Sequence, residues 1–245
     1  MQILGIRYDN LTRQDALEKA LSLLSGGRQA MIFFMNLDCL KKAAEDRQYA
    51  AALSEADLVL PDGVGLRIAI RLYGGRMKED CNGSDFSPML MREAARKGHK
   101  MFLLGGLPGV AQRAGDSLRR TIPGIEIVGA LDGYFKDDAA VIDAINASGA
   151  EILFIAMGVP IQEKWIQKNR KKLRIKLFLG VGALLDWLSW HKRRAPLFMQ
   201  RLYLEWLWRI MIDPERLFKR YLVDDAGFLV RLFFRRLKGD RGFPG

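Results

Sequence analysis

Short apolar runs alternate along most of the chain with longer segments in which apolar residues recur every three or four positions. The short runs are typical of buried β-strands, and the longer spacing is typical of amphipathic helices. The alternation predicts βα units around a mostly parallel sheet, because parallel neighbours need a crossover connection. We expect strands at Met31–Met35, Asp57–Leu60, Lys100–Leu104, Glu126–Ala130, Glu151–Met157 and Lys176–Gly180, and helices at residues 12–24, 38–54, 63–73, 85–97, 109–120, 137–147 and 160–172.

The pattern changes after Trp190. Two further helices are expected at about 196–212 and 214–238, since Asp213 is a good N-cap and Pro214 suits a first helical turn. In the second helix, aromatic, aliphatic and arginine side chains occupy neighbouring positions, as in helices that lie on a membrane surface. A helix packed on the α/β core would have the same periodicity, but the density of arginines favours anionic lipid.

These patterns predict an α/β fold with two parts. Residues 1–190 form the α/β core of the protein, a Rossmann-like, mostly parallel sheet flanked by helices. Residues 191–245 form a C-terminal helical appendage that is basic, amphipathic and membrane-associating.

Composition and charge narrow the class of partner. The chain has 245 residues, of which 49% are hydrophobic and 27% charged, as in folded globular proteins. It carries 39 basic against 28 acidic residues, a net charge of +11, and thirteen of the basic but only six of the acidic residues follow Trp190. Such an excess favours nucleic acid, a phosphate ligand or a membrane surface.

Several classes are disfavoured by what the sequence lacks. The start, MQILGIRYDN, has no signal-peptide pattern, no run of about 18 apolar residues occurs, and the two cysteines form no CxxC pair. These features predict a cytoplasmic protein. Two histidines cannot build the usual zinc sites and leave few choices for a Ser-His-Asp triad. P-loop, GxGxxG, HExxH and GxSxG motifs are also missing.

Asp62 is the strongest candidate for chemistry. It directly follows a predicted buried strand, behind Pro61 and before Gly63, where its carboxylate would project into the crevice at the end of the sheet. Partial burial would raise its pKa and suit it to act as a general base on an acceptor hydroxyl. The alternative is that Asp62 only caps the helix starting near Val64.

Other polar residues and glycines lie at strand ends. Asn36 can both donate and accept hydrogen bonds. Gln162 and Glu163 fall in the first turn of a predicted helix, where backbone N–H groups favour an anion, although Glu is also a routine first-turn residue. Glycines after strands let the backbone approach a phosphate, or serve turn geometry alone. They are Gly105, Gly106, Gly158, Gly180 and Gly182.

Together, seven stretches resemble the WecG/TagA/CpsF family of bacterial glycosyltransferases. They appear in the family's order and cover most of residues 30–221. They are ADLVLPDGVGL (56–66), NGSDF (82–86), FLLGGLPGVAQRA (102–114), PGIEIVGALDGYF (123–135), AMGVPIQEKW (156–165), GVGALLDWLSWHKRRAP (180–196) and LEWLWRIMIDPERLFKRY (204–221).

The resemblance implies inverting transfer of a sugar from a UDP-sugar donor to a polyprenyl-diphosphate-linked saccharide, at the inner face of the cell membrane. It implies no metal and no other cofactor, and the chain has no DxD motif. Asp62 matches the family's base, and Asn36 and Gln162 match polar active-site positions. The segments implied to hold the nucleotide contain Gly105, Gly106, Gly109, Tyr134 and Asp186, and the appendage arginines implied to reach over the site are Arg209, Arg216 and Arg220.

Two departures from the family pattern bear on the donor. Phe34 stands where commoner members have threonine, and Asp80 stands where they have an arginine. On this ground we predict a hexosyltransferase, with glucose as the sugar, in exopolysaccharide assembly. The alternatives are N-acetylmannosaminyl transfer, a nucleic-acid-binding protein that uses the basic tail, and a nucleotide-binding regulator without turnover. The main prediction includes no nucleic-acid partner, and it leaves a homo-oligomer open.

Overall fold

The computed structural model describes residues 1–191, 193–202 and 204–239, with the side chains of Leu197, Arg201 and Arg216 outside the description. Its centre is a six-stranded sheet of order β4-β3-β8-β7-β5-β6, in which every neighbouring pair is parallel. The six predicted strands and the α/β fold class are therefore confirmed. The strands are β3 Ala30–Met35, β4 Leu58–Pro61, β5 Lys100–Gly105, β6 Glu126–Leu131, β7 Ile152–Ala156 and β8 Leu177–Gly180.

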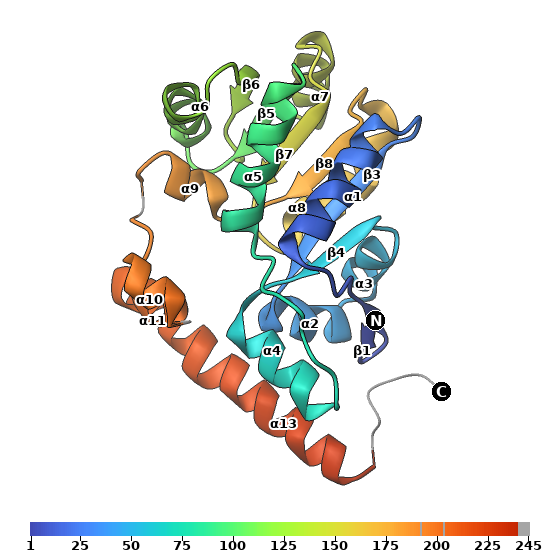
Figure 1. Cartoon of the computed structure of the whole chain (residues 1–245), viewed down its shortest axis with the longest axis vertical. Coiled ribbons are helices and arrows are strands. Elements are labelled where there is room, and N and C mark those ends of the chain that lie inside the picture. The colour runs from blue at the N-terminus through green and yellow to red at the C-terminus, as the bar shows by residue number, and fades with distance from the viewer. Residues whose placement is uncertain (192, 203, 240–245) are drawn as a thin grey trace.

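Helices cover both faces of the sheet (Figure 1). One face packs against α1 Arg13–Ser25, α5 Gly83–Arg96, α6 Val110–Thr121 and α9 Leu184–Leu188. The other core includes residues of α2 Leu37–Glu45, α3 Arg47–Ser54, α4 Gly63–Leu72, α7 Asp138–Ala147 and α8 Ile161–Asn169, which the 3-10 turn η1 Arg170–Lys172 follows.

Strand β3 explains why the predicted strands read as continuous apolar runs. All its residues are buried, and successive side chains point to opposite faces. Ile32 and Phe34 pack in the core beside α1 and α5, whereas Met31 and Phe33 pack in the core beside α2 and α8. Both faces therefore require apolar residues, as in covered parallel sheets.

Two local features differ from the sequence prediction. The helix expected at 38–54 is broken into α2 and α3, because the Asp46 side chain accepts a hydrogen bond from the N–H of Tyr49 and caps a new helix. The chain also begins with a short antiparallel pair, β1 Gln2–Ile3 and β2 Ile6–Arg7, too short to leave a periodic pattern.

The C-terminal segment is helical, as predicted, but more divided. The helix expected at 196–212 is two helices, α10 Leu197–Arg201 and α11 Glu205–Ile212. The second is helical throughout: α12 Pro214–Phe218, the π-helical stretch η2 Lys219–Asp225 and α13 Ala226–Leu237 form one long rod beside α4 (Figure 1). Among the described residues, no helix has the length and hydropathy needed to cross a bilayer.

Helix α13 has two different faces. Phe228 and Leu232 are buried in the same core cluster as Leu66 and Ile70 of α4. The apolar side chains on its outer side are exposed: Val230, Phe233, Phe234 and Leu237. Packing on the α/β core, the alternative to a membrane-surface helix, thus explains the inner apolar residues of α13 but not the outer ones. The division at residue 190 stays a prediction.

Candidate active site

A cavity of about 560 Å³ lies at the carboxyl ends of the strands. In open α/β sheets this edge forms the ligand crevice, because the turns after the strands diverge there. Its far wall is the C-terminal segment, through Arg209, Ile212, Leu217 and Arg220. Each of the six strands contributes a residue that follows it or ends it: Asn36, Asp62, Gly106, Gly133, Gly158 and Gly180.

A second cavity of about 480 Å³ lies between α4 and the C-terminal segment. Its apolar wall comes from Val64, Ile68, Trp206, Leu222 and Leu229. Its charged wall includes Arg13, Asp80, Asp85 and Arg194. The two cavities share five lining residues, Asn36, Asp62, Arg209, Arg220 and Tyr221, so they meet at the predicted base.

Asp62 is held at this junction by its backbone. It follows the last residue of β4, and its N–H donates to the carbonyl of Met35 at 2.9 Å. It occupies the N-cap position of α4, yet its carboxylate makes no capping hydrogen bond. The capping alternative therefore does not describe its side chain, which lines both cavities.

The surroundings of Asp62 make it a stronger base. Burial raises the pKa of its carboxyl to about 7, and the carboxylate of Asp80 adds to the rise. The guanidinium of Arg209 acts in the opposite direction. A carboxyl with a pKa near neutrality suits proton abstraction from a hydroxyl, because it is both ionised and basic at ordinary pH.

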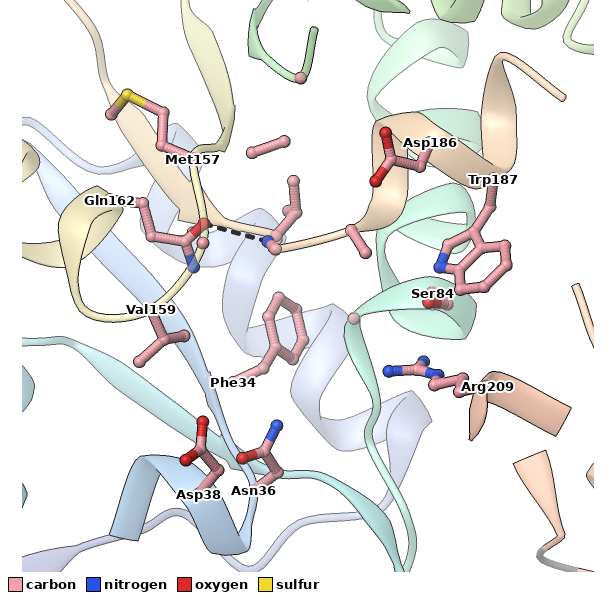
Figure 2. A pocket seen from close by; sticks show the side chains of 18 of the residues that line it. Phe34, Asn36, Asp38, Ser84, Met157, Val159, Gln162, Asp186, Trp187 and Arg209 are labelled. Carbon is pink, nitrogen blue, oxygen red and sulfur yellow. Dashed lines mark hydrogen bonds between the residues drawn. The ribbon is translucent and has the colours of Figure 1, made fainter. Parts of the chain in front are cut away.

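Asn36 serves the fold and the cavity together. It is the N-cap of α2, and its Oδ1 accepts a hydrogen bond from the N–H of Cys39 at 3.0 Å. This bond fixes the side chain with its amide nitrogen toward the cavity, beside Asp38 (Figure 2). The nitrogen is therefore available to donate to a ligand.

Gln162 joins two walls of the first cavity. Its Oε1 accepts from the N–H of Gly182 at 3.0 Å, the dashed line in Figure 2, and its Nε2 donates to Glu163 at 2.8 Å. It is only 1% exposed. Burial also raises the pKa of Glu163, to about 7. The first turn of α8 is thereby tied to the turn after β8.

The predicted nucleotide-binding residues divide into two groups. Gly106, Tyr134 and Asp186 line the first cavity. Gly105 and Gly109 do not line it: a Cβ on Gly105 would overlap the carbonyl of Ala156, and Gly109 has φ +81° at the N-cap of α6. For these two, the alternative of turn geometry describes the role that the structure gives them.

Two of the three predicted arginines reach the junction. Arg209 lies 5.5 Å from the ring centre of Trp187 and pairs with Glu205 at 3.2 Å, and Figure 2 shows it facing the cavity. Arg220 also lines both cavities. Arg216 belongs to α12, and its side chain lies outside the described part of the structure.

One of the ionic contacts that tie the C-terminal segment to the core was not predicted from the sequence. Arg220 pairs with Asp38 at 3.4 Å, and Lys42 pairs with the same carboxylate at 2.8 Å. Burial opposes ionisation of Asp38, but Arg220, Lys42 and Lys41 together lower its pKa below the usual value. The pair of Asp38 and Lys42 could have been predicted from the sequence, because the two residues are four positions apart on one helix. No feature of the sequence indicates the contact of Asp38 with Arg220.

Metal ligation was considered for the side chains that the structure describes. In the described ranges, no group of three His, Cys, Asp or Glu residues is placed to hold a metal ion. Cys39 and Cys81 are both buried free thiols.

Fold and site together define an α/β protein with a polar cavity at the carboxyl edge of a parallel sheet and a basic carboxylate at its end. The chain belongs to the glycosyl transferase WecG/TagA/CpsF family, whose model it matches over residues 1–242. The resemblance inferred from the seven stretches is thus confirmed.

Two relatives carry a specific name. Both are called N-acetylglucosaminyldiphosphoundecaprenol N-acetyl-beta-D-mannosaminyltransferase. The protein from Bacillus spizizenii (strain ATCC 23059 / NRRL B-14472 / W23) is 35% identical over 193 residues, which is 79% of this chain and 75% of that protein. The protein from Bacillus subtilis (strain 168) is 33% identical with the same coverage. This chain is therefore a glycosyltransferase of that family.

Proposed function

We propose that this glycosyltransferase moves N-acetylmannosamine from UDP-N-acetylmannosamine to an N-acetylglucosaminyl-diphosphate-polyprenol during assembly of a cell-surface polymer. The names of both relatives support this sugar, and they give no support to the glucose that we expected from Phe34 and Asp80. Phe34 lines the first cavity and also packs edge-on against Phe86, so its ring forms part of the cavity wall and part of the core.

The observation that carries the proposal is the position of Asp62 between two cavities. A transferase must bring two substrates to one base. The first cavity, with its glycine turns and helix starts, suits a nucleotide diphosphate. The second, with arginines beside an apolar wall, suits the diphosphate and first isoprene units of the acceptor.

In the proposed reaction, the Asp62 carboxylate takes the proton of an acceptor hydroxyl. The hydroxyl oxygen attacks the anomeric carbon, a new C–O bond forms, and the bond from that carbon to the phosphate oxygen breaks. UDP leaves with the electron pair. A single displacement of this kind inverts the anomeric centre, and Asn36 and Gln162 orient the sugar from the cavity wall.

The departing diphosphate gains negative charge that must be stabilised. Arg209 and Arg220 line both cavities, and each carries a guanidinium group with several N–H donors. Positioned donors of this type contribute about 3 kcal/mol each to a transition state. We propose that they do this work without a metal ion or other cofactor.

The proposal places the enzyme on a membrane surface, because its acceptor is anchored there. The C-terminal segment exposes apolar side chains next to basic ones, as interfacial helices do. The inner face of the cell membrane is the location that fits a UDP-sugar donor. We propose no nucleic-acid partner, because the basic C-terminal segment is proposed to bind the membrane surface.

The test is a donor screen with the full chain and a short-chain polyprenyl-diphosphate N-acetylglucosamine. We expect transfer from UDP-N-acetylmannosamine in preference to UDP-N-acetylglucosamine and UDP-glucose. Asp62→Asn keeps the shape of the side chain but removes the base, so we expect turnover to fall at least about a hundredfold. Asp116→Asn, a surface carboxylate on α6, is the matched control.

Three results would count against the proposal. Transfer from UDP-glucose alone would restore the hexosyl prediction. Wild-type turnover in Asp62→Asn would remove Asp62 from the mechanism. Tight UDP binding without transfer from any of the three donors would favour the nucleotide-binding regulator.

A further inference from the structure

The peptide that carries Asp62 is held by a neighbouring segment of the chain. The N–H of Cys81 donates to the carbonyl of Pro61 at 3.0 Å, and the N–H of Gly63 donates to Oδ1 of Asp80 at 3.0 Å. Asp62 thus lies between two hydrogen bonds from residues 80 and 81. With its own N–H bonded to Met35, its backbone is fixed on three sides.

Among the charged groups around Asp62, Asp80 has the largest effect on the pKa of its carboxyl. Both carboxylates line the second cavity, whereas only Asp62 lines the first. Burial raises the pKa of Asp80 as well, but the hydrogen bond that Asp80 accepts from Gly63 favours its charged form, and the Asp62 carboxylate has no such capping bond. The shared negative charge is therefore better accommodated on Asp80, and the last proton of the pair on Asp62.

The other charged groups around the pair are distributed on five elements or their ends. Arg13 at the start of α1, Arg67 of α4 and Asp85 of α5 act on Asp80. Arg209 and Glu205 of α11 and Arg220 of η2 act on Asp62. Cations thus surround two carboxylates that would otherwise repel each other, which allows the pair to exist in a partly buried site.

We propose that Asp80 is a positioning residue for the base: its carboxylate orients the Asp62 peptide through Gly63, and its charge makes Asp62 a stronger proton acceptor. This inference rests on the proposed function, and it assigns a role to a residue that the transfer chemistry itself does not touch. The inference also gives a reason for an acidic residue at position 80, beside the second cavity.

The inference predicts a pH effect with a definite sign. Burial and then Asp80 raise the pKa of Asp62, so wild-type activity should rise with pH up to about 7. In Asp80→Asn, an amide oxygen can still accept from Gly63, but the charge is gone. The pKa of Asp62 should then fall by about one unit. The acidic limb of kcat/KM moves to lower pH, and the plateau rate declines because the base is weaker.

The experiment measures kcat/KM against pH for the wild type, Asp80→Asn and Glu79→Gln. Glu79 is the adjacent carboxylate, but it pairs with Arg13 at 2.9 Å and lines neither cavity, so it is a matched control. A second measurement follows the 13C signal of the Asp62 carboxyl by NMR titration, assigned with Asp62→Asn. We expect both readouts to shift by about one pH unit in Asp80→Asn and not in Glu79→Gln.

An unshifted Asp62 titration in Asp80→Asn would overturn the role of the charge, and equal activity in Asp80→Ala and wild type would overturn the positioning role. If Asp80→Ala loses activity while Asp80→Asn keeps the wild-type pH profile, the hydrogen bond to Gly63 positions Asp62, but the charge of Asp80 plays no part, and that half of the inference is wrong. Failure of the proposed function is distinguishable, because it would show as no transfer by the wild type. The NMR titration does not require turnover.

Discussion

Two amide side chains, Asn36 and Gln162, line the first cavity and also make hydrogen bonds that hold the fold. Asn36 caps α2 with its oxygen, and Gln162 binds Gly182 with its oxygen and Glu163 with its amide nitrogen. Each amide keeps at least one hydrogen that no described residue accepts. These residues are rigid because the backbone holds them, so little rotamer freedom is lost when a sugar binds.

Glu163 should make the stability of the protein depend on pH. It is fully buried, its second oxygen lacks a partner among the described residues, and burial raises its pKa from 4.5 to about 7. A raised folded-state pKa means that the stabilisation is complete below pH 4.5 and is lost as pH rises through 7. In the wild type, ionisation of Glu163 should lower the free energy of unfolding by about 3 kcal/mol as the pH rises through this range. Glu163→Gln cannot ionise and should not show this decrease.

The measurement is urea unfolding of the wild type and Glu163→Gln at pH 5 and pH 8. Burial also raises the pKa of Asp225, to about 6. Because both proteins contain Asp62 and Asp225, the contributions of these two groups cancel in the difference between the wild type and Glu163→Gln. Glu126→Gln, at the exposed start of β6, should follow the wild type. Parallel stability curves for the wild type and Glu163→Gln would show that Glu163 titrates normally.

At the scale of the elements, helix α13 carries apolar residues both on the face that packs on the core and on the face that is exposed. Phe228 and Leu232 lie four residues apart on α13, so they share the face that packs on α4. Leu229 is partly buried against the same core, whereas the other large apolar side chains of α13 are exposed. The break between α2 and α3 has a different origin, since one aspartate side chain there competes with the helix for a backbone N–H.

Leu232→Ala should loosen this docking. The side chain is 0% exposed, and truncation of a buried leucine costs roughly 2–5 kcal/mol. Val230 on the same helix is 54% exposed, and Val230→Ala should change the free energy of unfolding by no more than about 0.5 kcal/mol. Urea unfolding and limited proteolysis of the C-terminal segment measure both effects. Equal behaviour of the two variants would mean that α13 does not pack on α4 in solution.

At the scale of the whole molecule, the C-terminal segment has two sides. One side forms a wall of the site, and the other carries exposed apolar side chains. Arg209 and Arg220 reach inward to the cavities. The exposed apolar side chains of the segment include Phe198, Leu202, Met211, Phe218, Val223, Val230, Phe233, Phe234 and Leu237. A surface that carries apolar and basic residues together can bind anionic lipid and keep the site near its acceptor.

The double substitution Phe233→Ser and Phe234→Ser tests this surface. The rings are 46% and 57% exposed and contact each other edge-on, so their loss should not destabilise the fold. We expect flotation with phosphatidylglycerol-containing vesicles to fall roughly tenfold or more, since each buried ring contributes at least about 1.5 kcal/mol. Leu107→Ser, 45% exposed at the rim of the first cavity, is the control. Undiminished flotation would mean that another surface binds the lipid.

Local sequence patterns were enough to predict many features of the structure. The strands and most helices follow from apolar periodicity, and Asp62 followed from its place directly after a strand. The helix break at Asp46 was missed because a capping aspartate inside an apolar period looks like an exposed helical residue. The names of the two relatives support N-acetylmannosamine and give no support to glucose. Phe34, on which the glucose prediction partly rested, packs against Phe86 as well as lining the first cavity, so its identity alone does not specify the donor sugar.

The elements, the fold class and the candidate base could be deduced from the order of residues, because hydrophobic period, capping and strand-end chemistry act over a few neighbouring positions. The strand order, the meeting of two cavities at Asp62, the contact of Arg220 with Asp38 and the bond from Gly63 to Asp80 could not. These are contacts between segments distant in the chain, and packing of the whole molecule alone brings them together.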